Sequence, residues 1–192
     1  MNDSLTRALL TQDVRTLELE FRIGIPGKRF TSCVGEARWN RLKKQLGDGG
    51  ARISTCEKIL TNPDGSSSKY VTGDGEPHWI HKKRLCDEDV QKRPWCVRTS
   101  LSLELKESGP PPKTWQHVRN KERVTYDVAP WKIDITRVSS LPVVDLDREH
   151  SYEVEIELAD RTEFFSREID EILHRGSAVA DDMIAFMTNE TL

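Results

Sequence analysis

The chain has 192 residues, of which 32% are charged and 36% are hydrophobic, a length that fits one domain whose core needs no disulfide or structural metal. Its 29 basic and 32 acidic residues exclude a globally basic field, so any site for a polyanion must be local. The sequence has no apolar run long enough for a membrane span, and no C-x-x-C pair among Cys33, Cys56, Cys86 and Cys96. We therefore expect a soluble intracellular protein with free thiols.

The predicted elements begin with a short helix at residues 2–12, where leucines recur at helical spacing. Residues 15–23 alternate between apolar and polar side chains as a strand does, and residues 36–46 form a helix that Gly47 ends. The chain then runs through further strands, predicted at residues 51–61, 68–72, 78–86, 95–106, 115–126, 131–138 and 151–159.

Two details complete this interpretation of the elements. Residues 87–89, Asp-Glu-Asp, are expected to form a solvated turn after the strand that ends at residue 86. Residues 162–188 repeat at the helical period, and Gly176 is expected to divide them into two helices.

Eight long strands with few helices predict a mainly β protein of the α+β class, built as a closed antiparallel eight-stranded β-barrel. Closure removes the long edges that such strands would otherwise expose. We expect one domain over residues 1–192, with the barrel at about 15–160 and the helices of 162–188 packed on its outside.

The polar faces of these strands are unusual. Side chains alternate across a strand, so Leu17, Leu19 and Phe21 share one face while Glu18, Glu20 and Arg22 share the other, and the remaining strands repeat this division. Their polar faces carry Arg98, Ser100, Ser102, Glu104 and Lys106; Arg119, Lys121 and Arg123; Lys132, Asp134 and Thr136; and Glu153, Glu155 and Glu157.

An amphipathic sheet with one solvated face is the ordinary explanation of such alternation. However, like charges recur along single strands, and like charges repel across neighbouring strands unless something neutralises them. The alternative is that the polar faces meet inside the barrel. Carboxylates there would suit a hard divalent cation, and Arg and Lys would suit phosphate oxygens. This predicts a site for a metal-complexed oligophosphate.

Two glutamate motifs carry a resemblance to a known family. Glu-Leu-Glu-Phe-Arg at 18–22 and Glu-Val-Glu-Ile-Glu-Leu at 153–158 resemble the motifs of the fungal and protozoal mRNA 5′-triphosphatases, which are triphosphate tunnel metalloenzymes. The basic strand at 119–123 and the strand at 131–136 resemble the pair that precedes the second motif, and the likeness covers about residues 15–160. The resemblance implies a tunnel barrel that removes the γ-phosphate from triphosphate-ended RNA in mRNA capping, and that also hydrolyses free nucleoside triphosphates.

The same resemblance implies roles for individual residues. The metal, Mg²⁺ or Mn²⁺, would belong to the acidic cluster Glu18, Glu20, Glu153, Glu155 and Glu157, with Glu18, Glu20 and Glu157 as direct ligands. Glu104 and Glu155 would position or deprotonate the attacking water, and Arg123 would act with them in catalysis. Asp134 would orient the cations that hold phosphate oxygens, namely Arg84, Arg98, Arg119, Lys121, Arg123 and Lys132.

Two alternatives remain open at this point. Another tunnel phosphohydrolase, such as a tripolyphosphatase or a thiamine-triphosphatase-like enzyme, would more often carry lysine where Arg22 stands. A non-enzymatic β-barrel that binds nucleic acid would need exposed aromatics among its cations, whereas rim or core packing is expected of Trp79, Trp95, Trp115 and Trp131. The expected partners are triphosphate-ended RNA, nucleoside triphosphates and an mRNA guanylyltransferase, with no membrane. The expected location is the nucleus, or the cytoplasm for a viral source.

Overall fold

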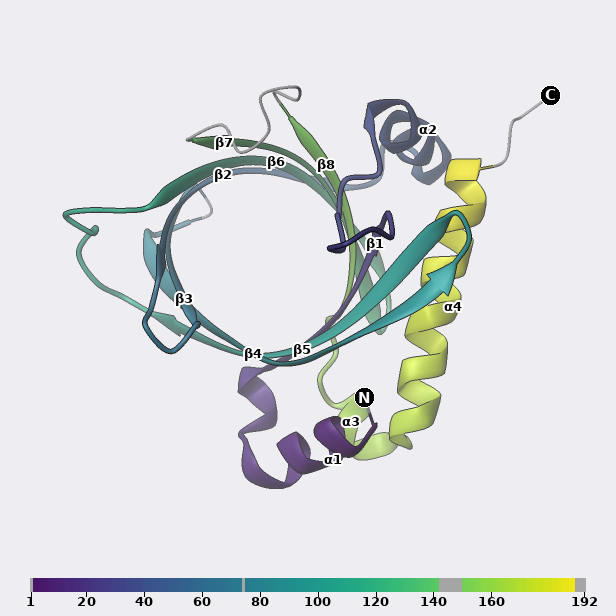
Figure 1. The fold of residues 1–192 in the computed structure, drawn as a ribbon, viewed down its shortest axis with the longest axis horizontal. Helices are drawn as coiled ribbons and strands as arrows, with labels where there is room; N and C mark the ends of the chain where they lie inside the picture. The colour runs from purple at the N-terminus through teal and green to yellow at the C-terminus, as the bar shows by residue number, and fades with distance from the viewer. Residues whose placement is uncertain (1, 74, 142–149, 189–192) are drawn as a thin grey trace.

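The computed structural model of the chain describes residues 2–73, 75–141 and 150–188, and shows a closed antiparallel barrel with helices on its outside (Figure 1). The strands are paired around the barrel in the order β1-β5-β4-β3-β2-β6-β7-β8. They are β1 (Leu17–Gly24), β2 (Ala51–Thr61), β3 (Ser67–Thr72), β4 (His78–Lys92), β5 (Trp95–Glu107), β6 (His117–Val128), β7 (Trp131–Leu141) and β8 (Ser151–Leu158). The helical elements are α1 (Asn2–Thr11), η1 (Val14–Thr16), α2 (Glu36–Leu46), α3 (Glu163–Ser166) and α4 (Ile169–Thr188).

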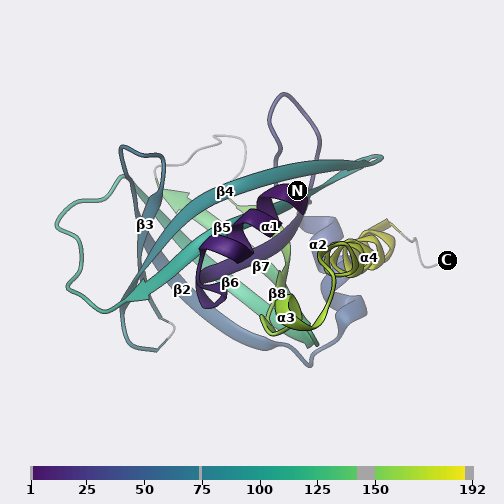
Figure 2. The same cartoon turned by 90° about the horizontal axis from the view of Figure 1, so that it is seen from below.

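Strand β1 closes the barrel because it pairs with β5 on one side and with β8 on the other. The predicted closed eight-stranded barrel is therefore confirmed. Each strand runs opposite to its neighbours, so the barrel has two ends. We call the end that holds the β4–β5 turn and the segment after Gly24 the hairpin end, and the end that holds the start of β1 and α3 the helix end (Figure 2).

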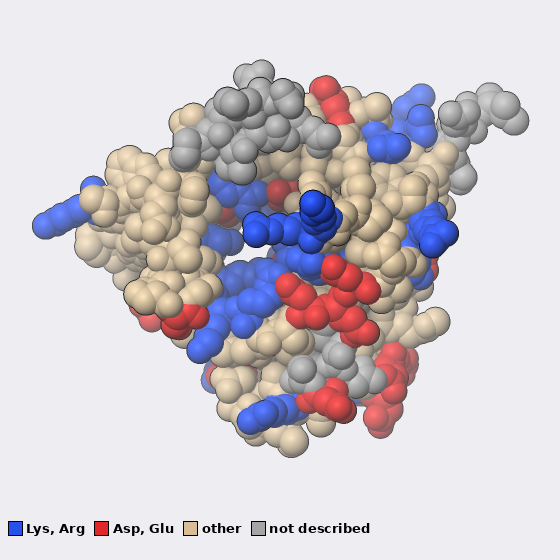
Figure 3. Space-filling model, viewed as in Figure 1, with Lys and Arg blue, Asp and Glu red and all other residues tan. Residues whose placement is uncertain are grey.

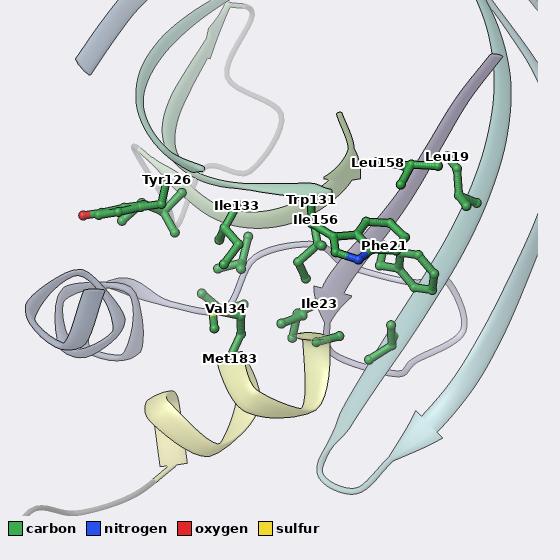
Figure 4. Packing of buried hydrophobic residues seen from close by; sticks show 14 of the residues in the cluster. Leu19, Phe21, Ile23, Val34, Tyr126, Trp131, Ile133, Ile156, Leu158 and Met183 are labelled. Carbon is green, nitrogen blue, oxygen red and sulfur yellow. The ribbon is translucent and has the colours of Figure 1, made fainter. Parts of the chain in front are cut away.

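The apolar faces of the strands point outward, as predicted from their alternation. Leu19, Leu101, Val124, Ile133 and Val154 are all buried on the outer surface of the barrel. Helices α2 and α4 cover part of this surface, as Figures 1 and 4 show. The main apolar core thus lies between the barrel wall and the helices, and the barrel interior is left to polar side chains.

The predicted break at Gly176 is wrong, because α4 continues through it without interruption. A Cβ at position 176 would lie 2.3 Å from the ring of Phe21 and 2.8 Å from that of Trp131. These two rings meet edge to face, with centroids 5.6 Å apart (Figure 4). Gly176 therefore allows α4 to approach the barrel closely. The packing that results offsets the low helix propensity of glycine.

Strand β4 is longer than predicted. Residues 87–89 were expected to form a turn, yet they lie within β4 and pair with Ser100, Thr99 and Arg98 of β5. The pairing continues to Lys92 and Trp95, and the Lys92 ammonium lies 2.9 Å from the Asp181 carboxylate of α4. Cross-strand pairing and this contact hold residues 87–92 in β4, although the acidic run at 87–89 does not indicate a strand in the sequence. No helix in the described part of the chain is long and apolar enough to cross a membrane.

Candidate active site

The barrel encloses a cavity of about 700 Å³ that is lined by side chains from all eight strands. Charged residues make up most of its wall, and Figure 3 shows Lys and Arg gathered around the opening that faces the viewer. The charged lining residues are Glu18, Glu20, Arg22, Glu57, Lys69, Lys82, Arg84, Asp87, Glu104, Lys106, Arg119, Lys121, Arg123, Lys132, Glu155 and Glu157. The polar strand faces therefore meet inside the barrel, as the recurrence of like charges predicted.

One part of the wall is acidic. Glu18 and Glu20 follow each other on the inner face of β1, and Glu20 is directly opposite Glu157 of β8. Burial raises the pKa of Glu157 to about 7, against the pull of Lys132 and with further help from Glu18. Burial likewise raises the pKa of Glu20, against Lys82 and with help from the neighbouring carboxylates. For both carboxylates, burial and the neighbouring negative charges outweigh the pull of the cations that contact them.

This acidic cluster has the donor chemistry of a divalent metal site. Glu18, Glu20 and Glu157 offer oxygen ligands from adjacent strands. A cation between them would offset the cost of burying their charges, which raises the pKa of Glu20 and of Glu157. Within the described residues, however, no three carboxylate, imidazole or thiol groups converge on one metal-binding point. The Lys82 ammonium contacts Glu18 and Glu20, and the Lys132 ammonium lies 3.0 Å from Glu157. Glu18, Glu20 and Glu157 therefore fit a divalent metal by their oxygen donors and by the pairing that places Glu20 beside Glu157.

The inner face of β6 is basic. Arg119, Lys121 and Arg123 occupy successive inward positions, and each meets a different carboxylate. The shortest distances are 2.8 Å from Arg119 to Glu153, 2.7 Å from Lys121 to Glu57 and 2.9 Å from Arg123 to Asp134. Burial lowers the pKa of Arg119 and of Arg123, but the facing carboxylates outweigh it and hold both pKa values above the ordinary range. Both guanidinium groups therefore stay charged.

Glu155 lies between the acidic and basic parts of the wall. Burial favours its neutral form, but Lys121, Arg123 and Arg22 together hold its pKa well below the usual range. A carboxylate of low pKa is a weak proton acceptor at neutral pH. The structure thus favours a positioning role for Glu155, and leaves Glu104, which also lines the cavity, as the other predicted residue for the attacking water.

Three predicted site residues do not line the cavity. The guanidinium of Arg98 donates hydrogen bonds of 2.6 and 2.8 Å to Asp89, outside the lining, because β4 extends far enough to face it. Asp134 lies behind Arg123 and also accepts a 2.6 Å hydrogen bond from Thr125. Glu153 is paired with Arg119, away from Glu18 and Glu20. Asp134 and Glu153 therefore each hold an arginine of β6 in place, Arg123 and Arg119 respectively, and in this arrangement Glu153 lies with the basic part of the wall.

The sequence interpretation missed several residues of the cavity. Lys82 is the most important, since it contacts both glutamates of the first motif. The sequence did indicate Lys82, because it lies two positions before Arg84 and therefore on the same face of the strand. Glu57 and Lys69 are each the one charged residue on the inward face of their strand, so only the register of β2 and β3 reveals them. Asp87, which was expected in a solvated turn, also lines the wall.

Glu57 provides a test of how this network stabilises the barrel. Burial opposes ionisation of Glu57, but Lys121 and Lys69 lower its pKa to about 2. Its contribution to stability is then present above the unfolded pKa near 4.5 and is lost as the pH falls towards 2. We expect Glu57→Gln to lower the free energy of unfolding by about 3 kcal/mol at pH 7, measured by urea denaturation of the metal-free protein.

The difference between wild type and Glu57→Gln should shrink steadily below pH 4.5. Glu122→Gln is the matched control, because Glu122 points outward on β6 and its side chain is 62% exposed. A difference of equal size at pH 3 and pH 7 would contradict the assigned role of Glu57.

Known proteins resemble this chain in both sequence and fold. A family described as the mRNA capping enzyme, beta chain, matches residues 70–191. The 5′ RNA triphosphatase of Paramecium bursaria Chlorella virus 1 is 38% identical over 185 residues, which are 95% of either chain.

Two solved structures share the fold. The RNA triphosphatase of S. pombe has a TM-score of 0.74 at 19% identity, over 100% of this chain and 91% of that one. The Mimivirus capping enzyme triphosphatase has a TM-score of 0.69 at 14% identity, over 98% of this chain and 95% of that one. The family match and the viral relative establish more than the fold, and this chain belongs to the mRNA triphosphatase family, the beta chain of the mRNA capping enzyme.

Proposed function

We propose that this protein is a divalent-metal-dependent RNA 5′-triphosphatase that removes the γ-phosphate of triphosphate-ended RNA in mRNA capping. One observation carries the proposal: one cavity is lined both by three neighbouring glutamates of β1 and β8 and by a row of three cations on β6. Family membership and the name of the 38% identical viral relative support the same reaction. A binding module that uses exposed cations and aromatics is disfavoured, because these cations face the cavity.

The cavity residues divide the work of phosphoryl transfer. Glu18, Glu20 and Glu157 would hold the metal, which when bound supplies Lewis-acid polarisation of the γ-phosphate. Arg119, Lys121 and Arg123 stabilise the charge on phosphate oxygens, and their carboxylate partners keep them oriented.

Glu155 and Glu104 position the attacking water from the same wall. Because phosphoryl transfer needs charge neutralisation more than covalent chemistry, these roles suffice for the reaction. A nuclear location, cytoplasmic for a viral source, and a guanylyltransferase partner stay predictions that follow from this function.

The test compares three substrates that share a terminal phosphate. Purified protein is incubated with γ-labelled triphosphate RNA, ATP or tripolyphosphate, each with Mg²⁺, Mn²⁺ or excess chelator. We expect phosphate release from RNA with either metal, its loss in chelator and its return when metal is restored. A kcat/KM that is much higher for tripolyphosphate than for RNA would instead assign the protein to another tunnel phosphohydrolase. Full activity in chelator would contradict the metal requirement.

A further inference from the structure

The segment that follows β1 is a short, closed loop at the hairpin end of the barrel. Ile25 and Thr31 exchange two backbone hydrogen bonds of 2.9 and 3.2 Å, which close residues 26–30 into a turn. In Figure 2 the segment between β1 and α2 projects beyond the barrel at this end. Lys28 and Arg29 are exposed in this loop, and neither is paired with a carboxylate anywhere in the described part of the chain. We call residues 25–31 the rim loop.

The rim loop is held against the wall of the cavity by Phe30. The guanidinium carbon of Arg98 lies over the Phe30 ring, 4.4 Å from the ring centroid, and that of Arg22 lies 5.9 Å from the same centroid. Such cation–π contacts fix both the ring and the cations. Gly24 permits the close approach, since a Cβ there would lie 2.2 Å from the Thr31 carbonyl oxygen and 2.7 Å from the Phe30 ring. Lys28 and Arg29 are thus presented on a fixed support.

The charges inside the cavity are ordered along its length. Going from the helix end to the hairpin end of β1, the inward residues are Glu18, Glu20 and then Arg22. Glu157 lies near the helix end of β8, and Arg119 near the hairpin end of β6. Among the described carboxylates towards the hairpin end, Glu153 is paired with Arg119, Asp87 with Arg84, Asp89 with Arg98 and Glu57 with Lys121.

This order gives a bound oligophosphate a direction. The terminal phosphate belongs beside Glu18, Glu20 and Glu157, where a metal would be held. Towards the hairpin end a polyanion is attracted by Arg22, and beyond the cavity in that direction lie the exposed Lys28 and Arg29.

We propose that the RNA chain enters through the hairpin end and that Lys28 and Arg29 of the rim loop bind the first phosphodiesters beyond the 5′-triphosphate. This assignment rests on the proposed function and adds to it the means by which RNA is preferred over free nucleotides. ATP and tripolyphosphate end inside the cavity and do not reach the rim loop, whereas a single RNA strand extends to it. Lys28 and Arg29 therefore contribute to RNA affinity and not to the chemical step.

The test uses the double variant Lys28→Ala/Arg29→Ala, in which both side chains are exposed and no contact of the fold is lost. We expect its KM for a short triphosphate-ended RNA to rise about tenfold at 0.1 M salt, with kcat unchanged, because two phosphate contacts are lost. The slope of log(kcat/KM) against log[salt] should become shallower by about 1.4 on RNA, at roughly 0.7 per contact with a single strand. On ATP and tripolyphosphate, KM and kcat should stay within about twofold.

The matched control is Arg7→Ala/Lys44→Ala, which removes the same charge from exposed positions on α1 and α2. An equal rise in KM in the control, or an equal loss on RNA and ATP in the rim-loop variant, would overturn the assignment, since the effect would then be general electrostatics or damage to the cavity. A wild-type protein that hydrolyses ATP but not triphosphate RNA would refute the proposed function, and this assignment with it. Active wild type with an unaffected rim-loop variant would refute the assignment alone.

Discussion

Replacing Glu20 with Ala is expected to lower kcat on triphosphate RNA and on ATP by on the order of a thousandfold, the scale on which one pre-organised electrostatic contact affects catalysis. Glu20 is 5% exposed, lies opposite Glu157 and contacts Arg22, Lys82 and Arg84 at 3.3, 3.5 and 3.6 Å. Its removal takes one oxygen ligand from the metal site and leaves three cations with one fewer shared carboxylate. The measurement is steady-state phosphate release over a range of Mg²⁺ and Mn²⁺ concentrations.

Two comparisons separate loss of the metal site from loss of the fold. Glu20→Gln keeps the shape of the side chain and removes only its charge, so it should be as inactive as Glu20→Ala and should melt cooperatively. Glu122→Ala changes a glutamate that faces outward on β6 and should retain full activity. Near-normal turnover by a folded Glu20→Ala protein would rule out this metal site.

Arg123→Ala is expected to lower kcat/KM on triphosphate RNA and on ATP alike, by about a hundredfold to a thousandfold. Both substrates present the same terminal phosphates, and Arg123 lines the cavity while Asp134 holds it from behind at 2.9 Å. The measurement is kcat/KM on both substrates under the same metal conditions. The control is Arg137→Ala on β7, because Arg137 points outward and is paired with Glu122 at the surface.

Arg123→Lys should recover less than about a tenth of the lost activity, since a planar guanidinium can bind Asp134 and a phosphate at once, whereas an ammonium is a point charge on a flexible stem. Full rescue by lysine would show that charge alone is needed at this position. If Arg123→Ala weakened binding of RNA that lacks a triphosphate and left ATP hydrolysis unchanged, β6 would be a nucleic-acid-binding surface and its assignment to the cavity would be wrong.

The amino-acid sequence by itself determined which side chains face the cavity on most strands. Alternation is a local property with a period of two, so the inward positions of β1, β6 and β8 could be assigned before any pairing was known. The recurrence of glutamates at 18 and 20 and at 153, 155 and 157, and of cations at 119, 121 and 123, then predicted an interior of mixed charge, and all of these except Glu153 line the cavity. The same local information placed α2 and β2 at their observed bounds.

Only the tertiary structure decided which charged groups meet. The pairing of Arg98 with Asp89 depends on how far β4 and β5 stay in register, and that of Lys82 with Glu18 and Glu20 depends on β5 lying between β4 and β1 in the barrel. The continuity of α4 through Gly176 depends on the rings of Phe21 and Trp131, which are distant in the chain. Strand register and close packing are set by long-range contacts. A periodic sequence therefore defines the faces of each strand, whereas the closed barrel decides which faces oppose each other.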